Sequence, residues 1–137
     1  RNAIDRGANE TEWDLHLSTL FPEVRPRNYF EIRSPDMVDL PWIAAPIAMV
    51  AGICYHQPTA DAVSELLSHF DSDTLVSAGE RGVADKAIGA VAKDICELAF
   101  QGGNALGADY ISQDDLDILH EFVERYPANG RSPADDA

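Results

Sequence analysis

Residues 23–33 form the only stretch of this chain whose side chains alternate as those of a β-strand do. In a strand, residues two positions apart lie on the same face. One face therefore carries Val24, Phe30 and Ile32, with Pro26 and Asn28 between them, and is able to pack on a core. The opposite face carries three guanidiniums, two carboxylates and a phenol, from Arg25, Arg27, Arg33, Glu23, Glu31 and Tyr29.

This charged face has two interpretations. A half-exposed antiparallel strand commonly has such a solvated face, and Pro26 suits an edge strand or a bulge. Alternatively, the face is a site for anions and a metal, because arginine binds phosphate or carboxylate with a planar fork. A carboxylate among the arginines is able to hold a hard cation such as magnesium, which takes oxygen ligands and often shares them with substrate phosphates.

Length and charge restrict the class of protein. The chain has 137 residues and is 45% hydrophobic, which is enough for one domain with a core and argues against disorder. Its 10 basic and 24 acidic residues give a net charge of −14, which argues against nucleic acid or an anionic membrane as the main partner. Cys54 and Cys96 have no ligand spacing, so we expect no zinc site and two reduced, buried thiols in a cytoplasmic protein.

Helical patterns fill most of the remaining sequence. The first helix is capped by Asn9 or Thr11 and ends before Pro22. We expect residues 71–83 to be less regular, a helix stop at the Gly102-Gly103 pair, and a polar tail after the last helix. The expected helices span residues 11–20, 40–55, 59–70, 84–100 and 113 to about 126, the last one capped by Ser112.

The second of these segments, residues 40–55, contains no charged residue. Asp39 is its expected N-cap, and Pro46 is expected to kink it. The segment is shorter than the ~20 residues that a membrane span needs. We therefore expect a helix that is buried on every side.

Two features need partners. A single strand cannot satisfy its own backbone hydrogen-bonding groups. A helix that is apolar all round also needs cover on every face, and the amphipathic helices provide only part of it. We therefore expect this chain to be the C-terminal part of a larger protein, or to find its partners in another subunit.

Three motifs resemble the plant-type glutamate–cysteine ligase family, which includes the related ligase of ergothioneine synthesis. They are residues 13–25 (WDLHLSTLFPEVR), residues 29–33 (YFEIR) and the ending at residues 130–135 (GRSPAD). More distantly, residues 30–36 (FEIRSPD), followed by an apolar helix, are similar to the last active-site strand of glutamine synthetases. The likeness thus spans nearly the whole chain.

The resemblance implies roles for residues of the charged face. By position, Glu31 is the expected metal ligand and Arg33 the residue that holds a glutamate carboxylate or a phosphate. Arg25 joins Arg33 as a catalytic candidate, and Arg27, Tyr29 and His16 join it as substrate-binding candidates. His16 also has the simpler interpretation of a packed core histidine, and Thr19 matches the motif without an assigned role.

The resemblance also implies a fold and an activity. The expected fold is α+β: the C-terminal, mostly helical part of a glutamine-synthetase-like catalytic domain, with one active-site strand at about 23–33 and four to five helices. The implied activity is ATP-dependent ligation of the glutamate γ-carboxylate to cysteine through an acyl phosphate, with Mg²⁺ as cofactor. Because the family's enzymes are much longer, we expect the remainder of the ligase chain as partner and no activity from residues 1–137 alone.

Two alternatives stay open at this point. The chain could be a non-enzymatic, acidic helical module whose strand and apolar helix dock a protein partner. It could also descend from such a ligase and now only regulate or scaffold. Neither the acceptor amine nor the thiol pathway follows from the sequence.

Overall fold

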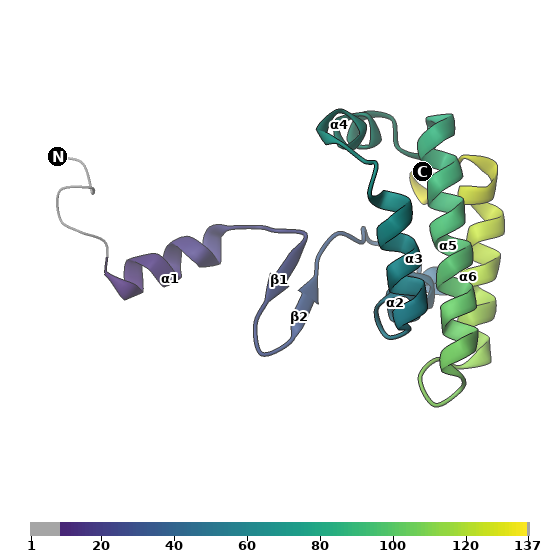
Figure 1. The fold of residues 1–137 in the computed structure, drawn as a ribbon, viewed down its shortest axis with the longest axis horizontal. Helices are drawn as coiled ribbons and strands as arrows, with labels where there is room; N and C mark the ends of the chain where they lie inside the picture. The colour runs from purple at the N-terminus through teal and green to yellow at the C-terminus, as the bar shows by residue number, and fades with distance from the viewer. Residues whose placement is uncertain (1–8, 137) are drawn as a thin grey trace. The chain divides into compact units, whose positions relative to one another are not determined.

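The computed structural model describes residues 9–136, and every structural statement below concerns this range. The chain divides into two compact units, Arg1–Met37 and Val38–Ala137. The first holds one helix and a small sheet, and the second holds five α-helices (Figure 1). The expected α+β composition is confirmed at this level, with six α-helices in the described range rather than four to five.

Helix α1 (Glu10–Thr19) opens the described part of the first unit. Asn9 is its N-cap, and it forms a capping box: the Glu12 backbone N–H donates to Oδ1 of Asn9 at 2.9 Å, and Glu12 Oε2 accepts from the Asn9 backbone N–H at 3.3 Å. Of the two expected caps, Asn9 is therefore the one used. No residue of α1 is buried.

The predicted single strand at 23–33 is wrong, because the segment folds back on itself. Strands β1 (Val24–Pro26) and β2 (Phe30–Ile32) pair antiparallel, and the Arg27 backbone N–H donates to the Tyr29 carbonyl within the turn at 2.7 Å. Pro26 has no N–H to continue a ladder, and the three residues after it reverse the chain. The segment thereby supplies its own pairing partner.

The predicted division into two faces nevertheless survives the reversal. The register pairs Val24 with Ile32 and Arg25 with Glu31. Directly opposed residues point to the same side of a sheet, and here both members of every pair are even-numbered or both are odd-numbered. Alternation along one strand and pairing across two strands therefore give the same charged face.

The second unit is a helical bundle. Its α-helices are α2 (Ala44–Cys54), α3 (Gln57–Leu67), α4 (Ser72–Arg81), α5 (Lys86–Leu106) and α6 (Gln113–Arg125). Its 3-10 turns are η2 (Leu40–Trp42), η3 (Gly82–Ala84), η4 (Pro127–Asn129) and η5 (Pro133–Asp136). Helices α2, α5 and α6 enclose the core, which is built from Ala45, Ala48, Cys96, Ala99, Ile111, Leu116, Leu119 and Val123.

Two boundary predictions in this bundle are wrong. Residues 72–81 form the regular helix α4, and the Asp71 side chain caps its first turn. Gly79 lies within this helix on its solvent-exposed side. The Gly102-Gly103 pair does not stop α5 but lies inside it, buried against neighbouring helices. Packing therefore outweighs the low helix propensity of glycine at Gly102 and Gly103.

Helix α2 also differs from its prediction. Pro46 is the third residue of the helix, where its missing N–H has no intrahelical partner to lose, so it does not kink the helix. One side is buried through Ala45, Ala48 and Gly52, but Ile47 is 67% exposed, so the expectation of burial on every side is wrong. Cys96 is buried as expected, whereas Cys54 is exposed. Within residues 9–136, no helix is both long and apolar enough to cross a membrane.

The segment after α6 is folded rather than a free polar tail. Asp136 accepts hydrogen bonds from the Tyr126 hydroxyl at 3.0 Å and from Nη2 of Arg125 at 3.0 Å, and Arg131 Nη2 lies 2.5 Å from its other oxygen. Tyr126 and Phe122 pack edge-on against Trp42, which joins the last helix to the start of the unit. These contacts hold the chain end against the bundle.

Candidate functional site

The charged face of the hairpin gathers three arginines around one carboxylate. Oε2 of Glu31 lies 3.6 Å from Nη1 of Arg25 and 3.8 Å from Nε of Arg27, and its Oε1 lies 3.6 Å from Nη1 of Arg33. We call these four residues the arginine cluster. Three positive charges against one negative charge leave a local excess of two positive charges, in a chain whose net charge is −14.

The hairpin itself creates this arrangement. Arg25 and Glu31 are directly opposed across the two strands, and Arg33 follows two residues later on the same face. The Arg33 backbone N–H donates to the Glu23 carbonyl at 2.8 Å, which continues the pairing beyond β2 and holds that side chain over the sheet. The turn brings Arg27 within reach of Glu31 from the other end.

The connection between α1 and β1 contributes two further contacts. Nη2 of Arg25 donates to the Leu20 carbonyl at 2.8 Å. The Phe21 ring lies under two guanidiniums, with its centroid 4.7 Å from Cζ of Arg33 and 5.7 Å from Cζ of Arg25. The Arg25 side chain is only 15% exposed, and its Nε is buried without a hydrogen-bond partner in the described structure. Sequence reasoning missed Phe21, because nothing in a linear pattern shows that a residue after a helix meets two strand residues.

Two other predicted site residues lie apart from these contacts. Tyr29 is in the turn, 60% exposed, and its described hydrogen bond uses the backbone carbonyl rather than the phenol. His16 is exposed in α1, beside the Trp13 ring at 5.8 Å, and its carbonyl accepts from the Thr19 hydroxyl at 2.7 Å. The interpretation of His16 as a buried core residue is therefore wrong for this structure, and Thr19 serves the end of its own helix.

The donor set of the hairpin does not by itself fit Mg²⁺. Across residues 9–136, the structure brings together no group of three or more His, Cys, Asp or Glu side chains that could hold a metal ion. Within the arginine cluster Glu31 alone offers a carboxylate, and three guanidiniums compete for its oxygens. Chemically, such a cluster is able to attract and orient an anion, since guanidiniums supply positive charge together with forked N–H donors.

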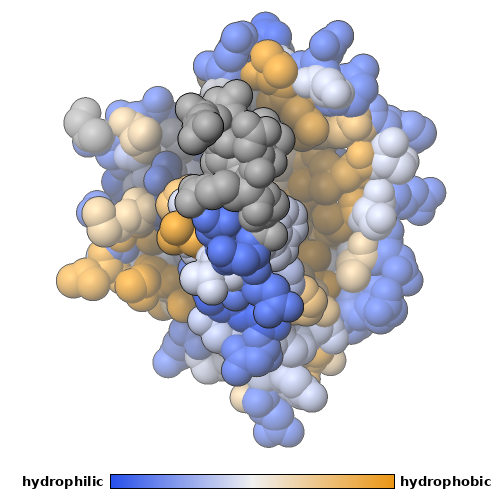
Figure 2. Space-filling view, turned by 90° about the vertical axis from the view of Figure 1, so that its left-hand side faces the viewer, coloured by the Kyte–Doolittle hydropathy of each residue, from blue (hydrophilic) through white to orange (hydrophobic). Residues whose placement is uncertain are grey.

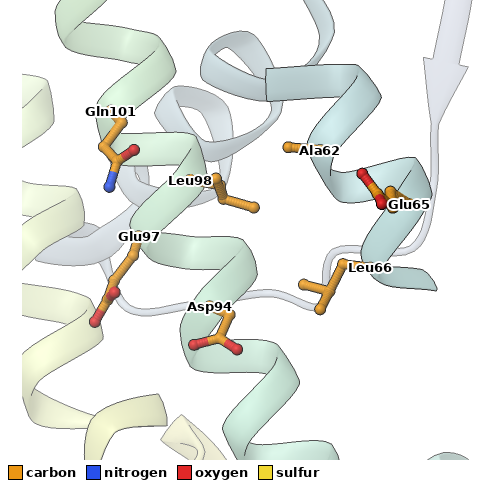
Figure 3. Close-up of a pocket in the computed structure, with 7 residues that line it drawn as sticks. All are labelled: Ala62, Glu65, Leu66, Asp94, Glu97, Leu98 and Gln101. Carbon is orange, nitrogen blue, oxygen red and sulfur yellow. The ribbon is translucent and has the colours of Figure 1, made fainter. Parts of the chain in front are cut away.

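A groove in the second unit has the opposite electrostatic character (Figure 3). It lies between α3 and α5 and is lined by Ala62, Glu65, Leu66, Asp94, Glu97, Leu98 and Gln101. Glu65, Asp94 and Glu97 carry carboxylates, which repel carboxylate or phosphate ligands. The arginine cluster is therefore the candidate functional site of the described structure.

The fold and site define an α+β protein whose hairpin carries a cationic face, and comparison with known sequences specifies the family. The profile of the glutamate-cysteine ligase family 2 (GCS2) matches residues 2–136. Because this match covers nearly the whole chain, the chain belongs to that family, and the resemblance of its motifs to glutamate–cysteine ligases is confirmed.

Individual relatives agree with this membership. The chain is 30% identical over 135 residues to glutamate–cysteine ligase EgtA of Mycolicibacterium smegmatis, a match that covers 96% of the chain and 29% of that protein. It is 29% identical over 134 residues to the chloroplastic glutamate–cysteine ligase of Arabidopsis thaliana, covering 90% of the chain and 24% of the relative. The chain thus spans less than a third of the length of either protein. No solved structure matches the chain significantly.

Proposed function

We propose that this chain is the C-terminal portion of a glutamate–cysteine ligase catalytic domain. The observation that carries the proposal is the arginine cluster, in which three guanidiniums share one hairpin face. Both glutamate and ATP present carboxylate or phosphate groups, which such a face attracts and orients. The relatives named as glutamate–cysteine ligases support this choice of substrates.

The proposed reaction has two steps. The γ-carboxylate of glutamate attacks the terminal phosphorus of ATP, which forms an acyl phosphate and releases ADP. The amine of cysteine then attacks the acyl carbon, a C–N bond forms, the amine loses a proton and inorganic phosphate leaves. Negative charge develops on the transferring phosphoryl oxygens, so fixed positive groups lower the barrier.

Within this reaction, the described residues have electrostatic and binding roles. Arg33 and Arg25 would contact the glutamate carboxylate or the phosphoryl group, and Glu31 would hold their guanidiniums in position. Arg27 is half exposed on the turn, where it would contact a substrate from the rim of the cluster together with Tyr29. His16 is a proposed substrate contact from the motif alone, since its described neighbours are Trp13 and Thr19.

The role of magnesium rests on the resemblance. Mg²⁺ would supply charge neutralisation at the phosphates, with Glu31 as one ligand. The other ligands would have to come from residues outside the described cluster. The proposal instead assigns to this chain the binding and orientation of the anionic groups.

The same proposal accounts for the apolar surface of the first unit. On the face opposite the arginine cluster, Val24 is 47% and Phe30 is 77% exposed. A two-stranded sheet with an exposed apolar face is marginal in water. We propose that the remainder of the ligase covers this face and extends the hairpin into the antiparallel sheet of a glutamine-synthetase-like fold.

One observation favours the alternative of a docking module without activity. Ile43, the N-cap residue of α2, and Ile47 within the helix are 56% and 67% exposed, so an apolar strip at the start of α2 is uncovered. Apolar residues are also visible on the face drawn in Figure 2. Under this alternative, the strip binds a protein partner and the arginine cluster is a solvated surface.

An assay of the full-length protein that contains this chain separates the two functions. ADP release would be followed with ATP, Mg²⁺ and glutamate, with and without cysteine. Cysteine-dependent release is the expected result. No release with cysteine or any other small amine would refute the ligase and favour the docking module.

A cytoplasmic location stays a prediction, since the plant relatives are named as chloroplastic.

A further inference from the structure

We propose that Phe21 is a positioning residue that holds Arg25 and Arg33 ready to receive one anionic group of the substrate. This inference rests on the proposed function and adds to it a residue that belongs to neither the charged face nor the substrate set. The Phe21 ring contacts both guanidiniums, at 4.7 Å from Arg33 and 5.7 Å from Arg25.

The Phe21 ring offsets part of the repulsion among the guanidiniums, which the single charge of Glu31 does not neutralise. Three guanidiniums lie within 3.8 Å of one carboxylate, so they repel one another with a single negative charge between them. The face of an aromatic ring attracts a cation through its quadrupole. Unlike a second carboxylate, a ring adds no negative charge and takes up no N–H donor, so the donors stay available to an anion.

The contacts also divide the three arginines into two classes. Arg25 and Arg33 share the Phe21 ring, and their side chains are 15% and 27% exposed. Arg25 is further fixed by its hydrogen bond to the Leu20 carbonyl. The Arg27 side chain is 50% exposed, and its described side-chain contact is with Glu31. The geometry therefore points to Arg25 and Arg33 as the preorganised pair, with Arg27 as the more exposed arginine that has fewer contacts.

Exposure supports a role for the ring beyond packing. Phe21 is 72% exposed, so within the described residues it gains little from burial. A carboxylate of glutamate and a phosphate of ATP present the same chemistry to the pair, namely anionic oxygens spaced for two N–H donors. The kinetic arms of the test below distinguish these two sources.

The test uses the full-length protein with Phe21→Leu, which keeps an apolar side chain but removes the aromatic face. Phe21→Trp keeps the face and serves as the rescue variant. Phe30→Leu is the matched control, because it makes the same change on the apolar face of the hairpin, opposite the arginine cluster, where leucine keeps an apolar side chain. We expect Phe21→Leu to lower kcat/KM on the order of tenfold, and we expect Phe21→Trp and Phe30→Leu to stay close to the parent protein.

The Michaelis constants identify the group that the pair receives. A rise in KM for glutamate alone indicates the carboxylate, and a rise in KM for ATP alone indicates the phosphate. Equal kinetics of Phe21→Leu and Phe30→Leu in an active ligase would overturn the positioning role and leave the proposed function standing.

A second measurement does not depend on activity. In NMR spectra of the arginine Nε–Hε groups, the Phe21 ring should shift the Arg33 signal upfield, and Phe21→Leu should abolish that shift while Arg27 is unchanged. Titration with inorganic phosphate or glutamate should then move the Arg33 signal at lower ligand concentration in the parent than in Phe21→Leu. Identical titrations, or no response to either ligand in the parent, would overturn the inference. A ligase-inactive protein with the expected titrations would refute the proposed function alone.

Discussion

Gly52 of α2 and Gly102 of α5 face each other where the two helices cross. A Cβ added to Gly102 would collide with the Gly52 carbonyl oxygen and lie 2.7 Å from Oγ1 of Thr59. A Cβ added to Gly52 would collide with the Ala99 carbonyl oxygen. The two backbones therefore approach more closely than a side chain at either position permits.

The first prediction follows from this crossing. Gly102→Ala should lower the free energy of unfolding by about 1–3 kcal/mol, because both colliding groups are held in packed helices. Gly79→Ala is the matched control, since a Cβ there meets nothing within 4 Å. It should be neutral or stabilise by about 0.5–1 kcal/mol through helix propensity. Urea unfolding of both variants, followed by circular dichroism, checks this pair, and equal stability of the two would contradict the close approach.

The second prediction concerns Glu31. In the full-length protein, Glu31→Gln should lower cysteine-dependent ADP release on the order of 10²-fold, because the three arginines lose their shared counter-charge. Glu23→Gln is the control, since Glu23 lies on the same face but meets Arg33 through its backbone carbonyl. A magnesium titration of each variant separates the two proposed roles: a metal ligand shifts the Mg²⁺ dependence, whereas an arginine partner shifts the KM of a substrate. An unchanged rate and an unchanged Mg²⁺ dependence would refute both.

The third prediction is a pH dependence at the chain end. Hydrogen bonds from Arg125 and Tyr126, and the positive charge of Arg131, lower the pKa of Asp136 below its ordinary value of 3.8. A lowered pKa in the folded state means that the contact stabilises the protein above pH 4, and that this contribution is lost as the pH falls through the folded pKa.

Asp136→Asn should therefore lower Tm at pH 7 and flatten its decline between about pH 4 and pH 2. Asp109→Asn, a change of the same charge in the loop before α6, is the control. Thermal unfolding at a series of pH values, followed by near-ultraviolet circular dichroism of the Trp42 and Tyr126 cluster, measures both. Parallel curves for Asp136→Asn and the parent would show that the contact does not form.

The fourth prediction distinguishes the two cysteines. Burial raises the pKa of the Cys96 thiol to about 11, so roughly one molecule in a thousand carries its thiolate at pH 8. Cys54 is exposed at the end of α2. A thiol reagent should therefore label one cysteine in the folded chain and two in denaturant. Cys54→Ser should abolish the folded-state labelling, and rapid reaction of both thiols without denaturant would contradict the burial of Cys96.

The fifth prediction concerns the chain by itself. Residues 1–137 should show no cysteine-dependent ADP release, because the described residues supply one carboxylate at the cluster and no set of ligands for a metal. The full-length protein assayed in parallel is the control. Measurable ligation by the isolated chain would show that these residues contain a complete catalytic centre.

Local signals in the sequence predicted much of this structure. The capping residues Asn9 and Ser112 begin α1 and α6, because a cap acts within one turn of the backbone. Alternation along the sequence predicts that Arg25, Glu31 and Arg33 share one face, and the hairpin register confirms it for Arg25 and Glu31. The motifs of the ligase family were also readable, and the family match over residues 2–136 confirms them.

Errors arose where a distant contact outweighs a local preference. Gly102 and Gly103 have poor helix propensity, yet α5 runs through them, because a Cβ at Gly102 would collide with α2 and a Cβ at Gly103 would collide with Leu116 of α6. The polar ending is anchored because Asp136 meets Arg125 and Tyr126, ten or more residues earlier.

The sequence by itself determined the family, the helical caps and which side chains share the charged face, because these depend on neighbours within a few positions. The tertiary structure alone decided that residues 23–33 turn back into a hairpin, that Phe21 lies under Arg25 and Arg33, and that two helices cross at glycines. Such contacts depend on the free energy gained when separate segments meet, and a linear pattern does not contain that quantity.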